Sequence, residues 1–431
     1  MTFERNDAHQ QLTAEELKKV NISLSKTLVN ATLGLGILLA SLSSSASNEA
    51  LMDLLELLHQ KGTLTSSEME ILRNAAAADE EKATAATAQA TSNVEKKVAA
   101  IETKSKKSEW TEKVRLKGDL RARYQYQDID EGTDRSRGRI RYRLGVIAKP
   151  IDNWEVGAGL ASGGADQRST NQSFDGSFST KNINLDYAYA QYKMGNGVKA
   201  IAGKFKRKEY LWAPTDIMWD GDINPEGLGI NYSTKNAVGS AFVNTGIWVL
   251  EENSRSEDDS YMSYGQLGQK WENGGWKGTL AGTVYSFSDI NFVDDLSAHE
   301  GTNTDSKLSS FNLAGELGTK VGGGSWKVIG EYINNFETNT SDDTAWAAGM
   351  KYKKDKWAFK YIYTDIDANS VPDFLPDSDR FDGLTDVKGH EVEVKYALNK
   401  KVTLALDFYA MEDKATNINQ ELLQADVIVK F

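Results

Sequence analysis

Apolar and polar residues alternate along most of the chain after residue 112, which is the period of a β-strand with two different faces. The alternation continues to the last residue, and one face of the final stretch carries Leu423, Ala425, Val427, Val429 and Phe431. Chain ends usually fray unless a sheet holds them, so a strand that ends on an aromatic ring needs an apolar partner for that ring. The lipid around a closed barrel is such a partner.

Sixteen stretches with this period are predicted strands: 113–127, 137–148, 153–162, 182–192, 198–206, 226–234, 237–251, 260–271, 275–287, 309–321, 325–337, 343–353, 355–366, 388–398, 401–412 and 421–431. The connections between them alternate in length. Tight turns are predicted at 149–153, 194–197, 234–236, 272–274, 322–324, 354 and 399–400, and the long loops include 163–181, 207–225, 288–308 and 367–387. An even number of strands with short periplasmic turns and longer outer loops is typical of an outer-membrane barrel. The predicted fold is therefore an all-β transmembrane barrel of about sixteen antiparallel strands over residues 111–431.

The positions of proline and tryptophan support this fold. All five prolines lie in proposed connections, as expected because a proline inside a strand removes a ladder hydrogen bond. Four tryptophans each follow a short turn, where a strand leaves the periplasmic side: Trp154, Trp276, Trp326 and Trp357. Their rings are expected at one depth, as an aromatic girdle at the periplasmic interface.

Residues 47–110 are predicted to form a short helical periplasmic segment. Leucines cluster on one stripe between residues 51 and 58, Gly62 can end that helix, and Thr65 to Glu68 can cap the next one. Val94, Val98 and Ile101 then recur at helical spacing. Two interpretations remain open: a helix that self-associates as a coiled coil, and a solvated single-helix spacer.

Residues 1–46 are predicted to be a signal peptide with an N-terminal extension. Lys18, Lys19 and Lys26 form a basic start, residues 28–40 form a short apolar core, and Ser44 to Ala46 offer a small-residue cleavage site. The alternative is a buried helix. Residues 1–17 are either an unusual extension or the result of an early start codon. The signal predicts export, with the barrel in the outer membrane and the helical segment in the periplasm.

Composition narrows the functional classes. Mean hydropathy is −0.50, which is compatible with a barrel because transmembrane strands are only half apolar. The net charge of −12 argues against a nucleic-acid partner. The chain has no cysteine, which excludes disulfides and thiolate chemistry. No cofactor or metal is predicted: Asp220 to Asn224 have calcium-loop spacing, but Pro225 replaces the expected glycine and Asn231 the expected glutamate.

Enzyme signatures are weak. The four histidines are scattered, and the chain has no nucleophile elbow, zinc-binding helix motif or phosphate loop. We therefore predict no enzymatic activity and no catalytic residues. A hydrolase built on loop aspartates and His299 is the remaining enzyme hypothesis.

The first two predicted strands carry a dense set of cations that we call the arginine wall: Arg115, Arg121, Arg123, Arg137, Arg139, Arg141 and Arg143. The alternate positions are mostly apolar. A cation that faces lipid at mid-bilayer costs about 2–4 kcal/mol, so the basic faces should point into the lumen. One hypothesis is a pore-lining wall that attracts or orients permeating anions. The other is a solvated face balanced by loop carboxylates.

The third long connection, 207–225, contains or adjoins four acids that could face this wall: Asp216, Asp220, Asp222 and Glu226. If this loop folds into the barrel, a transverse field would favour polar or charged solutes. As the third long loop, it is a candidate constriction loop. A second acidic stretch, from Asp373 to Asp386, is expected to be a solvated outer loop, with divalent-ion bridging near lipopolysaccharide as the alternative.

Three stretches resemble the putative-porin family of Gram-negative outer membranes: residues 54–65, residues 222–227, and the C-terminal part that begins at residues 386–390 and ends on a terminal Phe. This resemblance to general-diffusion porins implies a water-filled channel for passive diffusion of small polar solutes and ions. It also implies contact with membrane lipid and lipopolysaccharide, and a homotrimer by analogy. Phe431 resembles the signal that the outer-membrane assembly machinery reads. The alternative function is an envelope tether whose helical segment binds the cell wall or partner chains.

Overall fold

The computed structural model describes residues 52–106, 113–253, 258–288 and 301–431. The predicted signal peptide, its extension and His299 lie outside these residues. The chain divides into two compact units, residues 1–108 and residues 109–431, and each is described here by itself. Within the described part, none of the helices is long and apolar enough to cross a membrane.

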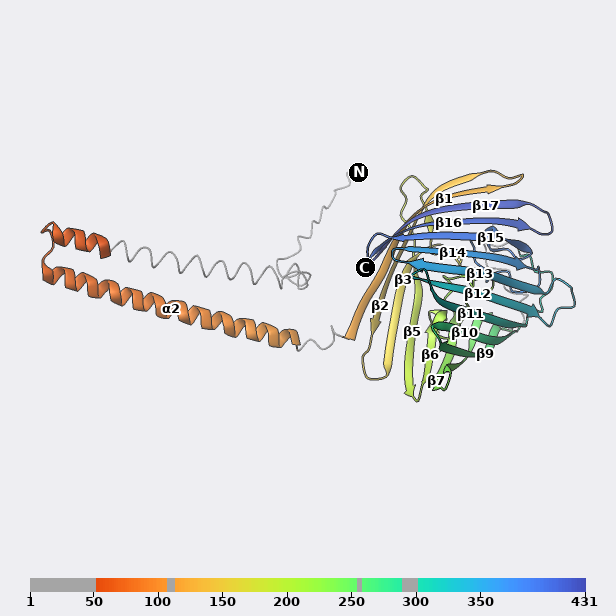
Figure 1. Ribbon diagram of the computed structural model, residues 1–431, viewed down its shortest axis with the longest axis horizontal. Helices are drawn as coiled ribbons and strands as arrows, with labels where there is room; N and C mark the ends of the chain where they lie inside the picture. Colours follow the sequence, from red (N-terminus) through yellow and green to blue (C-terminus); the bar gives the residue numbers. More distant parts are fainter. Residues whose placement is uncertain (1–51, 107–112, 254–257, 289–300) are drawn as a thin grey trace, which may run out of the picture. The chain divides into compact units, whose positions relative to one another are not determined.

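The described residues of the first unit, 52–106, are mainly helical (Figure 1). Residues 52–60 form one helix, and α2 spans Ser66–Lys106. Gly62 has a φ of 71° in the turn between them, which ends the first helix as predicted. The Thr65 N–H donates to Glu68 Oε2 at 2.9 Å, and the Glu68 N–H donates to Thr65 Oγ1 at 3.4 Å, which is the expected capping box. Self-association of α2 stays a prediction.

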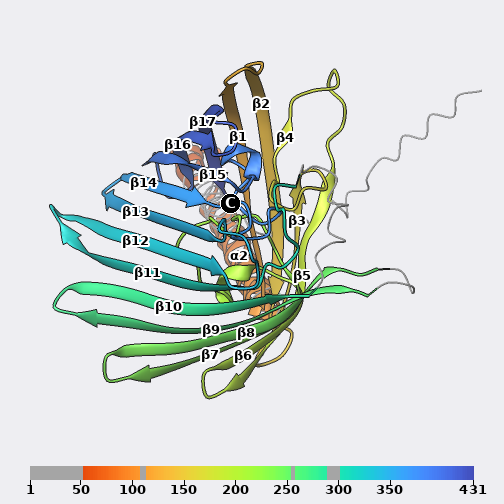
Figure 2. The same cartoon turned by 90° about the vertical axis from the view of Figure 1, so that its right-hand side faces the viewer.

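The second unit is one closed sheet (Figures 1 and 2). Its strands are β1 (Val114–Ile129), β2 (Arg135–Ala148), β3 (Trp154–Ser162), β4 (Gln172–Ser173), β5 (Ile183–Gly195), β6 (Val198–Lys204), β7 (Glu226–Asn236), β8 (Gly239–Glu251), β9 (Ser260–Asn273), β10 (Trp276–Phe287), β11 (Ser310–Val321), β12 (Gly324–Asn335), β13 (Thr344–Lys354), β14 (Trp357–Ile366), β15 (Val387–Ala397), β16 (Val402–Asp413) and β17 (Asn419–Lys430). Within the described residues, sixteen long antiparallel strands therefore form the barrel, which confirms the predicted fold class. The two-residue β4 is an extra strand in a predicted loop, where Ser173 pairs with Arg139 of β2.

The barrel closes between its first and last strands. The β1–β17 ladder runs from Asp119 opposite Lys430 to Ile129 opposite Gln420. Beyond it, the Phe431 N–H donates to the Gly118 carbonyl, and the Gly118 N–H donates to the Phe431 carbonyl, both at 3.1 Å. Because the first and last strands pair, the described strands leave no open edge to face the bilayer.

Large apolar side chains cover the outer face, as lipid contact requires. Examples from different strands are Leu116, Leu228, Leu267, Leu280 and Leu406, all of which are exposed. The Phe431 ring belongs to this face: it is 48% exposed and stacks on the Tyr142 ring with centroids 6.1 Å apart.

The four predicted girdle tryptophans all lie at the short-turn end of the barrel. Trp154, Trp276 and Trp357 are the first residues of β3, β10 and β14, and Trp326 is the third residue of β12. The rings of Trp276 and Trp326 contact each other edge to face, with centroids 6.5 Å apart. Their contact with the membrane interface stays a prediction.

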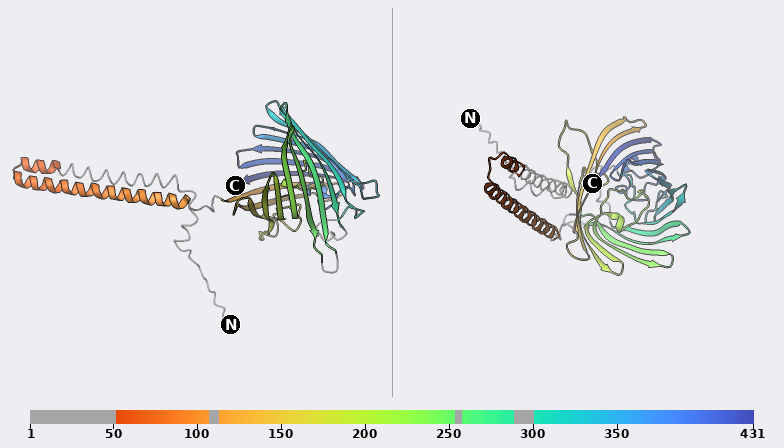
Figure 3. Two further views of the ribbon diagram at one scale, coloured as in Figure 1. Left: turned by 90° about the horizontal axis from the view of Figure 1, so that it is seen from below. Right: turned by 60° about the vertical axis from the view of Figure 1, so that its left-hand side comes forward.

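The interior of the barrel is partly packed by its own long loops (Figures 2 and 3). Apolar side chains of the loops before β7 and before β15 join inward-facing residues of β6 to β17 in one core. Trp219 packs edge to face on Trp248 of β8, with centroids 5.4 Å apart, and Phe374 and Leu375 are buried in the same core. The expectation of a solvated outer loop at 373–386 is therefore wrong, because its apolar residues draw the segment inward.

Candidate functional site in the barrel interior

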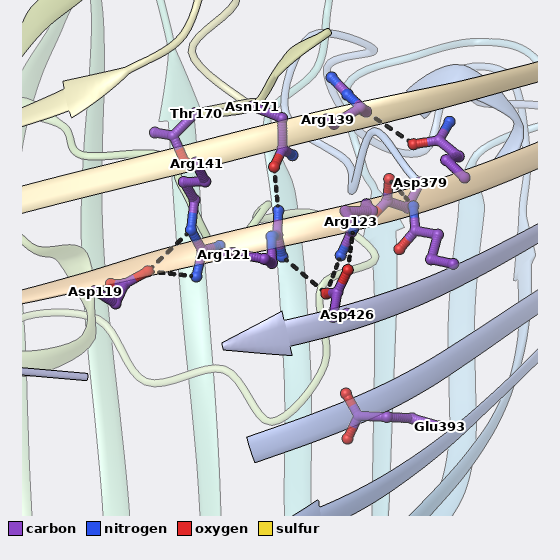
Figure 4. Close-up of polar contacts among 12 residues, drawn as sticks. Asp119, Arg121, Arg123, Arg139, Arg141, Thr170, Asn171, Asp379, Glu393 and Asp426 are labelled. Carbon is purple, nitrogen blue, oxygen red and sulfur yellow. Dashed lines mark hydrogen bonds and ion pairs between the residues drawn. The ribbon is translucent and has the colours of Figure 1, made fainter. Parts of the chain in front are cut away.

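The arginine wall lies on the inner face of β1 and β2, where its side chains meet the inward-folded loops (Figure 4). Antiparallel pairing places Arg121 directly opposite Arg141 and Arg123 directly opposite Arg139. All four side chains are mostly or fully buried. Like charges in directly opposed positions destabilise a sheet, so this arrangement requires nearby compensation.

Two carboxylates of the barrel wall supply part of that compensation. Asp119 of β1 accepts hydrogen bonds from Arg141 and Arg143, each with a 2.8 Å contact. Asp426 of β17 accepts two hydrogen bonds from Arg123, at 2.7 and 2.8 Å, and lies 3.5 Å from Arg121. Bidentate pairs of this kind are among the stronger ion pairs in proteins.

Loop residues supply the rest. Asp222, in the loop before β7, lies 3.1 Å from Arg143, and Asp379, in the loop before β15, lies 3.4 Å from Arg123. Burial would raise the pKa of Asp222, but the charges of Arg141 and Arg143 outweigh it and hold that pKa below its ordinary value. The two loops are therefore held against the wall by charge.

Arg139, Arg137 and Arg115 differ from the other four arginines. Arg139 donates to the Gln125 side-chain oxygen at 3.0 Å rather than to a carboxylate. Arg137 and Arg115 form no ion pair within the described residues, and Arg115 is exposed. Along the β1–β2 ladder, the neutralised arginines thus form the middle of the wall, with Arg115 on one side and Arg137 and Arg139 on the other.

The four predicted loop acids do not act together. Asp222 faces the wall, Asp216 pairs with Arg380, and Asp220 accepts the N–H groups of Asp222 and Ser378 at 2.6 and 3.1 Å. Glu226 lies apart: its side chain is exposed and pairs with Lys204 at 2.7 Å. It begins β7 on the outward-facing register, so the expectation that it faces the wall is wrong.

Arg380 was not identified from the sequence, although it joins the two inward loops. Its side chain is 1% exposed and contacts Asp216, Asp377 at 3.3 Å and Glu391 at 2.5 Å. Burial and the charge of Asp216 raise the pKa of Asp377 to about 8. The apolar residues Val371, Phe374 and Leu375 beside this acidic stretch were the available signal that it packs inward.

A cavity of about 510 Å³ lies beside the wall and has mixed charge. Its lining includes Lys117, Asp119, Arg143, Asp186 and Lys206. Fixed charges of both signs around a hydrated space can orient a polar solute and exclude apolar ones. Within the described part of the chain, no group of three or more His, Cys, Asp or Glu residues is placed to hold a metal ion.

An apolar outer face around a charged interior, on a closed barrel of sixteen long strands, defines an outer-membrane diffusion channel. Residues 126–327 match the family model described as a putative porin, which confirms the resemblance inferred from the sequence. The match lies in the barrel, so a role as an envelope tether is not favoured.

A solved porin shares this architecture. The high-pH structure of Pseudomonas putida OprB has a TM-score of 0.53 at 10% identity, over 74% of this chain and 95% of that one. At this identity the likeness shows the fold. A mutant of the Rh. blastica porin has a TM-score of 0.43 at 12% identity, over 74% of this chain and all of that one. No curated protein matches the sequence.

Proposed function

We propose that the protein is a porin that lets small polar or charged solutes diffuse passively across the outer membrane. The observation that carries this proposal is the closed barrel whose inner face at β1 and β2, with the adjoining loops, presents ion pairs beside a cavity of about 510 Å³. No cofactor and no enzymatic activity are assigned to it.

The solute is proposed to pass along the mixed-charge cavity beside the arginine wall, whose lining includes Asp119 and Arg143, and past Arg139, which bonds to Gln125 rather than to a carboxylate. Permeating groups would exchange contacts with partly paired charges, so that no single contact holds them for long. Conduction needs such weak, repeated contacts, because a solute must leave the site as readily as it enters.

Other parts of the chain receive matching roles in this proposal. The helical unit would lie in the periplasm, because the short turns of a barrel face that side. The four tryptophans would form the interfacial girdle, and Phe431 would serve as the signal for the assembly machinery. Assembly as a homotrimer is proposed by analogy with general porins.

Single-channel recording in a planar bilayer tests the proposal. Purified, folded protein should produce discrete current steps, and the same protein unfolded before reconstitution should produce none. Steps in groups of three would support the trimer. A folded barrel that inserts into the bilayer without passing current would overturn the proposed function.

Arg139→Gln tests the wall itself. Among the described residues, the Arg139 guanidinium contacts no carboxylate, and glutamine can keep a hydrogen bond to Gln125. The barrel should therefore fold while the step conductance changes. Arg135→Gln, which removes the same charge from an exposed position at the start of β2, is the control. Equal conductance in both variants and the unaltered protein would remove Arg139 from the permeation path.

A further inference from the structure

A second charged region lies on the opposite part of the barrel wall, at the short-turn end. Five lysines line one cavity of about 930 Å³, one from β7 and one from each of the neighbouring strands β9 to β12. We call these residues the lysine vestibule: Lys235, Lys270, Lys277, Lys320 and Lys327. Their side chains share the inner face of the barrel. Lys277 is in register with buried Thr279 of β10, and Lys327 is in register with buried Ile329 and Glu331 of β12.

The vestibule carries an excess of positive charge. The carboxylates that line the same cavity belong to Glu272 and Glu316. Glu272 lies 2.9 Å from Lys277, and Glu316 lies 2.8 Å from Lys327. The three other lysines have no carboxylate within ion-pair distance in the described part of the chain, and all three are exposed.

The strand register increases this excess rather than relieving it. Lys351 of β13 lies directly opposite Lys327 and forms no ion pair within the described residues. Lys360 of β14, opposite Lys351, adds no excess charge because it pairs with Glu391 and, at 3.7 Å, with Glu393. Lys351 donates to the Pro214 carbonyl at 3.4 Å, which brings the loop before β7 to the edge of the cluster. Opposed like charges destabilise a sheet, so lysines here are easiest to accommodate where water and counter-anions reach them.

The vestibule and the arginine wall therefore differ in what they offer a mobile ion. Arg121, Arg123 and Arg141 are buried and already have fixed carboxylate partners. The vestibule lysines are solvated ammonium groups around an open space, and most lack such partners. A cleft lined by one sign of charge concentrates mobile counter-ions about tenfold or more at low ionic strength.

We propose that the lysine vestibule is an anion-collecting site, and that it gives the channel a preference for small multivalent anions bearing phosphate or carboxylate groups. This proposal rests on the channel function proposed above. Several ammonium groups act on one multivalent anion at once, so attraction grows with the charge of the anion. Because the lysines remain hydrated, the site raises local concentration without trapping the anion.

The test is the reversal potential of the purified channel in a potassium chloride gradient at low ionic strength. The unaltered protein should prefer chloride to potassium. One variant combines Lys235→Gln, Lys270→Gln and Lys320→Gln. Its ratio of chloride to potassium permeability should fall roughly threefold or more, because the variant lacks the unpaired charges that concentrate anions. The control combines Lys354→Gln, Lys400→Gln and Lys401→Gln, which removes equal charge from exposed positions outside the cavity and should keep the preference.

Added pyrophosphate provides a second readout on the same channels. It should reduce the chloride current of the unaltered protein more than an equal concentration of acetate does, and the difference should shrink in the triple vestibule variant. An unaltered channel that prefers cations, or a preference that survives in the vestibule variant, would overturn the proposal while leaving the channel function intact. Absence of any current would instead overturn the channel function and this proposal with it.

Discussion

Arg380 is the residue on which both inward-folded loops converge. One guanidinium contacts three carboxylates, those of Asp216, Asp377 and Glu391, in a region from which water is largely excluded. Burial would raise the pKa of Asp216, but the charge of Arg380 outweighs it and lowers that pKa. Asp377 is left with less compensation, and its pKa is raised by burial and by the charge of Asp216. One arginine thus cannot keep all of these groups ionised.

This imbalance predicts a pH-dependent stability. The pKa of Asp377 is about 8 in the folded protein and about 3.9 in an unfolded chain. Between about pH 4 and pH 8, Asp377 is therefore protonated in the folded state and ionised in the unfolded chain. The stabilising effect of this proton is complete below about pH 4 and is lost as the pH rises through about 8.

Asp377→Asn should remove this dependence, because asparagine mimics the protonated carboxyl. The concentration of guanidinium chloride at the midpoint of unfolding should fall between neutral and alkaline pH. This fall should be less steep in the variant than in the unaltered protein. Asp343→Asn, at a partly exposed loop position, is the control. A variant with the same slope as the unaltered protein would show that Asp377 is not the titrating group.

At the scale of single elements, the closing pair of strands depends on a glycine. Gly118 of β1 faces the Phe431 ring, and a Cβ there would lie 2.5 Å from that ring and 2.5 Å from the Arg143 carbonyl oxygen. Backbone on one side and an aromatic ring on the other leave no room for a side chain. The same residue also holds the chain end through two backbone hydrogen bonds.

Gly118→Val should therefore weaken barrel closure. We expect a lower refolding yield and a lower temperature of unfolding. Both are measured from the mobility of unheated samples on denaturing gels. Gly265→Val is the matched control, because it lies on the outer face of β9 with no atom within 4 Å of the added Cβ. Equal losses in both variants would mean that valine in any strand, rather than the contact with Phe431, causes the effect.

The elements that could be predicted from the sequence are those whose environment repeats. Lipid on one side and a polar interior on the other impose the period of two, so the sixteen strands and the direction of the arginine wall follow from local pattern. The path of the loops does not follow from local pattern, because it depends on contacts between residues far apart in the sequence. Examples are Asp222 with Arg143 and Arg380 with Asp216. Glu226 shows the limit most directly, since one step of register at the start of β7 decides which side of the wall it faces.

At the scale of the whole molecule, the two units have separate structural support. The barrel ladder closes on itself from β1 to β17, and every strand in it belongs to residues 109–431. The helical unit has its own turn and cap at Gly62 and Thr65. Neither set of hydrogen bonds requires the other unit.

Deletion of residues 52–106 should therefore leave the channel intact. We expect the truncated protein to refold in the same yield and to show the same step conductance and reversal potential as the full chain, because the wall, the loops and the lysine vestibule are all retained. Single-channel recording of both proteins at matched ionic strength provides the comparison. A replacement of the same residues by a flexible linker of equal length controls for the shortened chain. A changed step conductance in both the deletion and the linker variant would show that the helical unit contributes to the conduction path.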